Sequence, residues 1–185
     1  MIQVVFETHS ISEDNEQEVA SGWSHSMLSP RGRELARELG QRRTADGIDV
    51  VFSSDLRRAV ETAEIAFAGT ATPVLLDWRL RECDYGDLNA RPVAEHAVNR
   101  AQYLDEPYPA GESWRQAVTR IGGFLKDLPS RWAGKRVLVI GHVATRWGLD
   151  HYLAGVTLED LAAADFGWRE GWEYSLEPTT AGSGS

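Results

Sequence analysis

The sequence predicts an α/β fold, a three-layer α/β/α sandwich with a mainly parallel central sheet. Short runs rich in β-branched residues, such as 2–6 and 136–141, have the composition of strands buried on both faces. Longer amphipathic segments alternate with these runs, which is the pattern of parallel strands joined by helices. The chain has 185 residues, 42% hydrophobic and 25% charged, which is enough for the core of one domain.

The first predicted elements are a strand at 2–6 (IQVVF) and a helix at 31–43 (RGRELARELGQRR). The polar stretch 7–26 is too irregular to predict an element. Ser29-Pro30 opens the helix, because proline is favoured in a first turn, and its leucines share one stripe.

The middle of the chain continues the alternation. A second strand at 48–52 follows Gly47, and a helix at about 56–68 follows three residues, Ser53-Ser54-Asp55, whose side chains can cap it. A third, shorter strand is predicted at 73–76. The segment 78–108 is mixed, and we expect loops with short helical pieces there.

The clearest helix is 111–128, because its apolar residues fall three and four positions apart and share one face. These residues are Trp114, Val118, Ile121, Leu125 and Leu128. The strongest buried strand, 136–141, leads into a helix at about 143–153, and 172–176 can add an edge strand. One domain is therefore predicted over 1–178, followed by a disordered tail at 179–185, whose residues are small and polar.

The residues that follow the predicted strands indicate a ligand site, because ligands of parallel α/β sheets bind beyond the carboxyl ends of the strands. These residues are Glu7 to Ser10, Ser53 to Arg58, Asp77 to Glu82, and Gly141 to Ala144. They bring together two imidazoles, several guanidiniums and one carboxylate. The helix start beside Arg58 adds backbone donors, so this edge of the sheet is suited to an anion.

Composition excludes several functional classes. Nineteen Lys plus Arg against 28 Asp plus Glu give a net charge of -9, so no nucleic-acid or anionic-membrane surface is expected. Cys83 is the single cysteine, which excludes an internal disulfide and a cysteine-based zinc site and favours a reducing compartment. No apolar run approaches the roughly 20 residues of a membrane span, and the first residues predict a strand instead of a signal segment. A cytoplasmic protein is expected.

Four blocks of motif residues occur together, in order and at suitable spacing. They are His9, Asn15, Gly22-Trp23 and Leu28 to Gly32; Ser53 to Ala59 with Glu61 to Ala63; Leu80 to Glu82 with Tyr85-Gly86; and Gly111 to Ser113 with Val139 to His142. With these blocks the chain resembles the histidine phosphatase superfamily, in the phosphoglycerate mutase-like branch named for an Arg-His-Gly motif. The resemblance covers nearly the whole chain and implies a phosphoglycerate mutase-like fold.

Carried over position by position, the resemblance implies four catalytic residues. His9 would attack phosphorus and become phosphohistidine. Arg58 and His142 would hold the phosphate oxygens and stabilise the charge that builds up. Glu82 would act as general acid and then as general base. No metal or cofactor is expected, because cationic side chains supply the electrostatic stabilisation and the sequence has no metal-spaced ligands.

The chain departs from the family at the centre of the motif, where Thr8 replaces the arginine and Ser10 replaces the glycine. A threonine hydroxyl gives one neutral hydrogen bond, whereas arginine binds phosphate through two charge-assisted ones. We expect Thr8, Ser10, Asn15 and Val143 to contact substrate. Arg146 follows His142 by one helical turn, and we hypothesise that it partly replaces the missing arginine, with Arg57 and Arg81 as other possibilities.

The sequence therefore predicts a metal-independent phosphatase of small phosphorylated metabolites, a phosphoric monoester hydrolase. Only a modest stretch separates Glu82 from the helix at 111–128, so an open pocket that admits water is expected and mutase activity is disfavoured. Two alternatives stay open because of Thr8: a binding module with weak turnover, and acid/base chemistry on a substrate without phosphate. A homodimer is possible on sequence grounds, and the substrate and pathway are not determined by the sequence.

Overall fold

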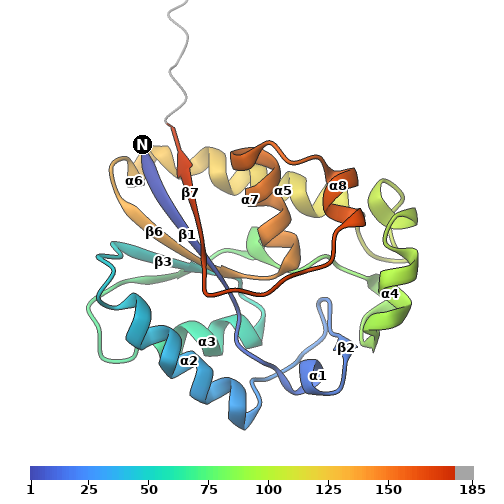
Figure 1. The fold of residues 1–185 in the computed structure, drawn as a ribbon, viewed down its shortest axis with the longest axis horizontal. Helices are drawn as coiled ribbons and strands as arrows, with labels where there is room; N and C mark the ends of the chain where they lie inside the picture. Colours follow the sequence, from blue (N-terminus) through green and yellow to red (C-terminus); the bar gives the residue numbers. More distant parts are fainter. Residues whose placement is uncertain (178–185) are drawn as a thin grey trace, which may run out of the picture.

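In the computed structural model, residues 1–177 are described, and five strands form the central sheet in the order β4-β3-β6-β1-β7. The strands are β1 (Ile2–Thr8), β3 (Val50–Ser53), β4 (Val74–Leu76), β6 (Arg136–Gly141) and β7 (Trp172–Leu176). The first four strands are parallel, and β7 pairs antiparallel with β1 at one edge. Helices lie on both sides of this sheet (Figure 1), which confirms the predicted sandwich.

Alternating side chains of the central strands pack on the two helical layers. Val4 and Phe6 of β1 belong to the core under α5 (Trp114–Asp127) and α7 (Val143–Ala154). Val5 points to the other face, which is covered by α2 (Pro30–Arg43) and α3 (Arg57–Ala66). This burial on both faces explains why β1 and β6 read as continuous apolar runs.

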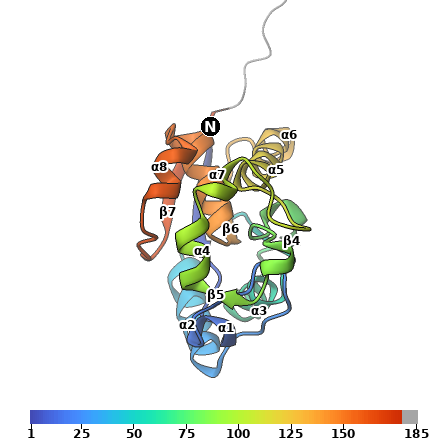
Figure 2. The same cartoon turned by 90° about the vertical axis from the view of Figure 1, so that its right-hand side faces the viewer.

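The segments predicted as irregular carry short elements that gather beyond the carboxyl ends of the parallel strands (Figures 1 and 2). They are α1 (Glu13–Glu16), η1 (Trp78–Leu80), η2 (Gly86–Leu88), α4 (Val93–Asn99) and η3 (Gln102–Leu104), and a two-stranded sheet of β2 (Val19–Ala20) and β5 (Arg91–Pro92). Because the paired residues Ala20 and Arg91 are 71 positions apart, the pairing of β2 with β5 is a tertiary contact without a local signal.

Two short helices, α6 (Pro129–Trp132) and α8 (Leu158–Ala163), were not predicted. The Thr157 side chain caps α8 by accepting a hydrogen bond from the Asp160 N–H, a signal that the sequence does contain. After α8, the residues 165–171 form a segment without helix or strand that leads to β7 (Figure 1). The predicted tail at 179–185, and with it the predicted boundary at 178, lies outside the described residues.

Candidate active site

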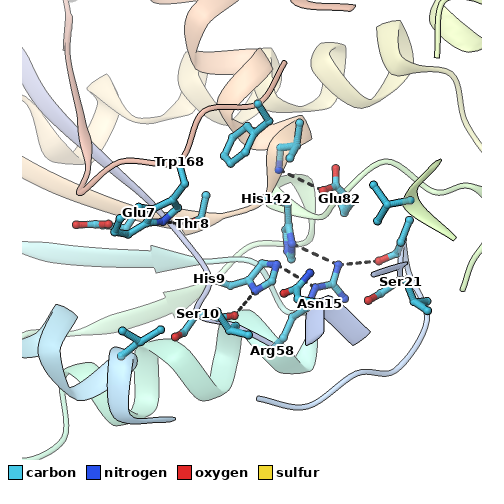
Figure 3. Close-up of a pocket in the computed structure, with 18 of the residues that line it drawn as sticks. Glu7, Thr8, His9, Ser10, Asn15, Ser21, Arg58, Glu82, His142 and Trp168 are labelled. Atoms are coloured by element: carbon cyan, nitrogen blue, oxygen red, sulfur yellow. Dashed lines mark hydrogen bonds between the residues drawn. The ribbon is translucent and has the colours of Figure 1, made fainter. Parts of the chain in front are cut away.

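A cavity of about 700 Å³ lies at the carboxyl ends of β1 and β6. It is lined by eight of the nine predicted site residues and by others from α2, β2, α4 and the 165–171 segment (Figure 3). The eight are Thr8, His9, Ser10, Asn15, Arg58, Glu82, His142 and Val143. The strand-end rule therefore located the cavity from sequence.

His9 directly follows β1, and its backbone N–H extends the ladder by donating to the Gly141 carbonyl at 2.9 Å. Burial and the neighbouring Arg58 guanidinium lower the pKa of His9 to about 3, so the ring is neutral near pH 7. Nδ1 lies 2.7 Å from the Ser10 carbonyl oxygen, which only accepts, so Nδ1 carries the proton. Nε2 is left with its lone pair, which accepts a hydrogen bond from Arg58 Nε at 3.3 Å.

Arg58 enters the cavity from the first turn of α3 and is almost fully buried. Its Nη2 donates to the Gly22 carbonyl at 2.8 Å and lies 3.3 Å from His142 Nδ1. Gly22 has φ +52°, and a Cβ there would lie 1.8 Å from Asn89 Oδ1, so glycine is required where the chain presents this carbonyl. Nη1 has no hydrogen-bond partner among the described residues.

His142 follows β6 and is held by the Thr145 hydroxyl, which accepts from its backbone N–H at 3.0 Å. Burial and the Arg58 charge lower the pKa of His142 well below its usual range, so this ring is neutral too. Because the guanidinium can only donate, Nδ1 accepts and Nε2 carries the proton. Nε2 is also buried without a partner in the described chain.

Two buried donors, Arg58 Nη1 and His142 Nε2, thus have no partner in the described part of the chain, and they lie near the unprotonated Nε2 of His9. The two imidazole rings are 4.9 Å apart, centre to centre. An unsatisfied buried donor costs about 1 to 3 kcal/mol, so such groups are retained where a ligand satisfies them. The Arg58 cation, with its own donor and that of His142, favours an anion that accepts hydrogen bonds on several sides, such as a phosphoryl group.

Glu82 lies just after η1 and beside His142, and its carboxylate is directed at the first turn of α7 (Figure 3). Oε1 accepts from the backbone N–H groups of Cys83 at 2.9 Å and Ala144 at 3.0 Å, and Oε2 accepts from Val143 at 3.2 Å. The backbone of Glu82 is fixed as well, since its carbonyl accepts from the Trp23 indole at 2.6 Å. The carboxyl group therefore has one well-defined position at the cavity wall.

Thr8 and Ser10, the two departures from the family motif, have partners of their own. The Thr8 hydroxyl accepts a hydrogen bond from the Trp168 indole at 3.2 Å. Ser10 is tied to the α2/α3 layer: its hydroxyl donates to the Gly32 carbonyl at 2.6 Å, and its N–H donates to the Thr62 hydroxyl at 2.9 Å. Asn15 lines the cavity and caps α1 by accepting from the Ser12 N–H at 3.0 Å.

Arg146 is not brought to the cavity, so the structure does not support it as the substitute arginine. Its Nε donates to Asp150 Oδ2 at 2.7 Å, one turn along α7, and its guanidinium stacks 4.4 Å from the Trp172 ring centre. The other two possibilities are engaged too. Arg81 makes a bidentate pair with Asp55 at 2.7 and 2.6 Å, and Arg57 lies 3.7 Å from Glu64 on the exposed side of α3.

Sequence reasoning missed several residues of the cavity wall, chiefly Arg42, His96, Phe166 and Trp168. Arg42 lies 3.7 Å from the buried Glu7 carboxylate, which Arg43 also binds at 2.8 Å. Burial nevertheless raises the pKa of Glu7. No strand-end or motif signal marks these positions, because they come from the far end of α2, from α4 and from the 165–171 segment.

Two further features of residues 1–177 bear on the functional class. No group of three or more His, Cys, Asp or Glu side chains is placed to hold a metal ion within this part of the chain. None of the helices described there is long and apolar enough to cross a membrane.

The model of the histidine phosphatase superfamily (branch 1) matches residues 5–169. The chain belongs to this superfamily. A relative named "Probable phosphoglycerate mutase GpmB" from Cronobacter sakazakii is 35% identical over 170 residues, 82% of this chain and 78% of its own length. A 2,3-bisphosphoglycerate-dependent phosphoglycerate mutase from Actinobacillus succinogenes is 28% identical over 95% of both chains.

Solved structures of the histidine phosphatase fold superimpose closely. The YhfR protein of Bacillus stearothermophilus has a TM-score of 0.83 and 23% identity, covering 100% of this chain and 98% of its own. A mycobacterial glucosyl-3-phosphoglycerate phosphatase in complex with VO3 has a TM-score of 0.75 and 23% identity, covering 88% and 87%. The family and fold expected from the motifs are thus confirmed.

Proposed function

We propose that the protein is a metal-independent phosphatase that hydrolyses small phosphomonoesters through phosphohistidine at His9. One observation carries the proposal: Arg58 Nη1 and His142 Nε2 are buried donors without partners in the described chain, beside the unprotonated Nε2 of His9. A phosphoryl group between them would satisfy both donors and would meet the nucleophile.

In the first step, His9 Nε2 forms a bond to phosphorus while the bond from phosphorus to the ester oxygen breaks. A protonated Glu82 gives its proton to that oxygen, which leaves as an alcohol. Arg58 and His142 donate to the phosphoryl oxygens, where charge accumulates. The neutral state of His9 supports this role, because a protonated ring would have no lone pair to attack with.

In the second step, water attacks phosphorus, the bond from phosphorus to His9 Nε2 breaks, and Glu82 takes the proton of the attacking water. The sum is ester plus water to alcohol plus phosphate, and no metal is needed. Glu82 lines the same cavity as His9, and its bond to the Val143 N–H places it beside His142, which supports its role as the proton carrier.

The missing arginine is part of the proposal. The Thr8 hydroxyl is hydrogen-bonded to Trp168. The charge-assisted contact that an arginine at this position would make to phosphate is therefore missing, and its loss is expected to weaken phosphate binding by about 1.5 to 3 kcal/mol. We therefore propose a slow enzyme whose phosphate affinity comes mainly from Arg58.

Phosphoglycerate mutase activity is the second candidate, favoured by the name of the 35% identical relative. It requires the phosphoenzyme to keep its phosphoryl group until the glycerate is rephosphorylated. The open side of the cavity, where Trp168 is 62% exposed, favours hydrolysis instead. Conversion of 3-phosphoglycerate to 2-phosphoglycerate faster than release of phosphate would establish the mutase.

Phosphohistidine trapping tests the proposal. The protein is mixed with an aryl phosphate, quenched within milliseconds, and examined by mass spectrometry for an acid-labile phosphate on His9. The His9→Ala variant should lose label and turnover, while His151→Ala should keep both, since the His151 ring bonds to the Val156 carbonyl outside the cavity. Binding without turnover would indicate a binding module, and turnover without label would indicate a different chemistry.

A further inference from the structure

The cavity is larger than a phosphoryl group requires. His9, Arg58 and His142 occupy one end of a volume of about 700 Å³, and the remainder extends between α2, α4 and the 165–171 segment. A substrate bound by its phosphate would place its leaving group in this space. The chemistry of the remaining wall therefore decides which esters fit.

That wall is mainly apolar and aromatic. It includes Ile11, Val19, Val93, Trp114, Phe166 and Trp168. Four of these are large hydrophobic side chains left exposed in the described chain: Ile11 at 37%, Val93 at 46%, Phe166 at 39% and Trp168 at 62%. Exposed apolar side chains that gather from three segments around one cavity mark a binding surface for an apolar group.

The aromatic wall is fixed in place by the residue that replaces the motif arginine. The Trp168 indole donates to the Thr8 hydroxyl at 3.2 Å (Figure 3), and Glu170 of the same segment lies 3.8 Å from Arg42. An arginine at position 8 has only donors, so it could not accept the indole N–H. Compared with an arginine at this position, Thr8 lacks a contact to phosphate but holds an aromatic side chain beside the nucleophile.

Charge around the leaving-group space disfavours a second anionic group. Besides Glu82, three carboxylates line the cavity: Glu7, Glu38 and Glu170. Besides Arg58, two guanidiniums line it: Arg42 lies 3.7 Å from Glu7 and 3.8 Å from Glu170, and Arg100 Nη1 donates to the Ala164 carbonyl at 3.2 Å. A carboxylate or second phosphate on the substrate would therefore face more carboxylates than guanidiniums, and both of these guanidiniums are already engaged.

We propose that the preferred substrates are monophosphate esters whose leaving alcohol is uncharged and carries an aromatic or other large apolar group, packed between Phe166, Trp168 and Val93. This inference rests on the proposed function, and it sets the site apart from one built for phosphoglycerates. Phe166 and Trp168 act as specificity-determining residues, and Thr8 positions Trp168.

Three primary alkyl esters with similar intrinsic reactivity test the inference: 2-phenylethyl phosphate, ethyl phosphate and 3-phosphoglycerate. The expected order of kcat/KM is phenylethyl first, ethyl second and phosphoglycerate last. Packing of one aromatic ring against the wall should favour the phenylethyl over the ethyl ester by about tenfold. The difference should lie in KM, because the ring is remote from the breaking bond.

Variants separate the wall from general effects on the enzyme. Trp168→Ala and Phe166→Ala should each reduce the phenylethyl-to-ethyl ratio of kcat/KM about three- to tenfold. Trp168→Phe should keep most of the ratio. The matched control is Trp78→Ala, since Trp78 is also half exposed, at 53%, and does not line the cavity.

An unchanged ratio in both alanine variants, or a preference for 3-phosphoglycerate over the phenylethyl ester, would overturn the inference while leaving the phosphatase intact. Absence of turnover and of phosphohistidine with every ester would overturn the proposed function instead. Calorimetry would then decide the inference: 2-phenylethyl phosphate should bind the unmodified protein about tenfold more tightly than inorganic phosphate. Equal affinities would refute it.

Discussion

Replacing Arg58 with methionine should remove phosphate binding while changing the stability of the ligand-free protein only slightly. Methionine replaces the aliphatic part of the arginine side chain and lacks the guanidinium and its charge. The substitution removes the hydrogen bond to the Gly22 carbonyl at 2.8 Å, worth about 1.5 to 3 kcal/mol for a charged donor. It also removes a buried Nη1 without a partner in the described residues, which costs about 1 to 3 kcal/mol.

The substitution also removes two longer hydrogen bonds, from Arg58 to His9 Nε2 and to His142 Nδ1, both at 3.3 Å. The loss of these hydrogen bonds destabilises the protein, and the removal of the buried charge and of the unpartnered donor stabilises it. Burial lowers the pKa of Arg58, which means that the folded protein holds this charge at a cost relative to the unfolded chain. We therefore expect the free energy of unfolding of Arg58→Met to lie within about 2 kcal/mol of that of the parent protein. The substitution should instead be severe for an anion, because a charge-assisted contact of about 1.5 to 3 kcal/mol corresponds to about 10- to 150-fold in affinity.

Urea unfolding with and without inorganic phosphate measures both quantities. Phosphate at 100 times its Kd should stabilise the parent protein by about 2.7 kcal/mol, and a variant with 100-fold weaker binding by only about 0.4 kcal/mol. Arg57→Met, on the same helix with its side chain 40% exposed, is the matched control and should respond like the parent. A variant stabilised by phosphate as much as the parent, or destabilised without phosphate by more than about 4 kcal/mol, would refute the reasoning.

Three further predictions follow from the site. Glu82→Gln should lower kcat about 10²- to 10⁴-fold in steady-state kinetics and leave the affinity for vanadate, measured by calorimetry, within about threefold. An unchanged kcat would show that Glu82 does not transfer the proton. The pKa of His9 is about 3 in the folded protein and about 6.5 in the unfolded chain. As the pH falls below 6.5, the unfolded chain therefore takes up this proton while the folded protein does not, and the free energy of unfolding decreases. Between pH 7 and 5 this histidine should account for up to about 2 kcal/mol in urea unfolding, and His9→Asn should lose correspondingly less. Gly32→Ala places a Cβ 1.9 Å from the Ile11 carbonyl oxygen and should destabilise the fold by about 1 to 3 kcal/mol. The control Gly123→Ala, whose Cβ would have its nearest contact at 3.9 Å, should leave the stability unchanged. Equal melting temperatures of the two variants would contradict the packing argument.

The central elements were predictable because their signals are local. Strand β6 is an uninterrupted apolar run, and α5 carries its apolar residues on one face. The boundaries moved by a few residues: α5 begins at Trp114, after the Ser113 cap, instead of at 111. Motif spacing also identified the family, which the match over residues 5–169 confirmed.

Arg146 shows where local reasoning ends. Its position one turn after His142 is correct, since both lie at the start of α7. The choice between the cavity and Asp150 depends on the direction of the side chain and on Trp172, which comes from β7. Helical periodicity predicts neither the direction of the Arg146 side chain nor the position of Trp172.

By itself, the sequence determined the order of strands and helices and the edge of the sheet where a ligand is expected, which follow from local apolar periodicity and from the rule that parallel strands end at one edge. The roles expected of His9, Arg58 and Glu82 at that edge came from the resemblance of the motifs to the family. Only the tertiary structure decided what Thr8, which stands in place of the motif arginine, contacts. Its hydroxyl accepts a hydrogen bond from Trp168, and these residues are 160 positions apart. Such a contact depends on how α8 and β7 close the chain over the cavity, and that geometry has no signature in neighbouring residues.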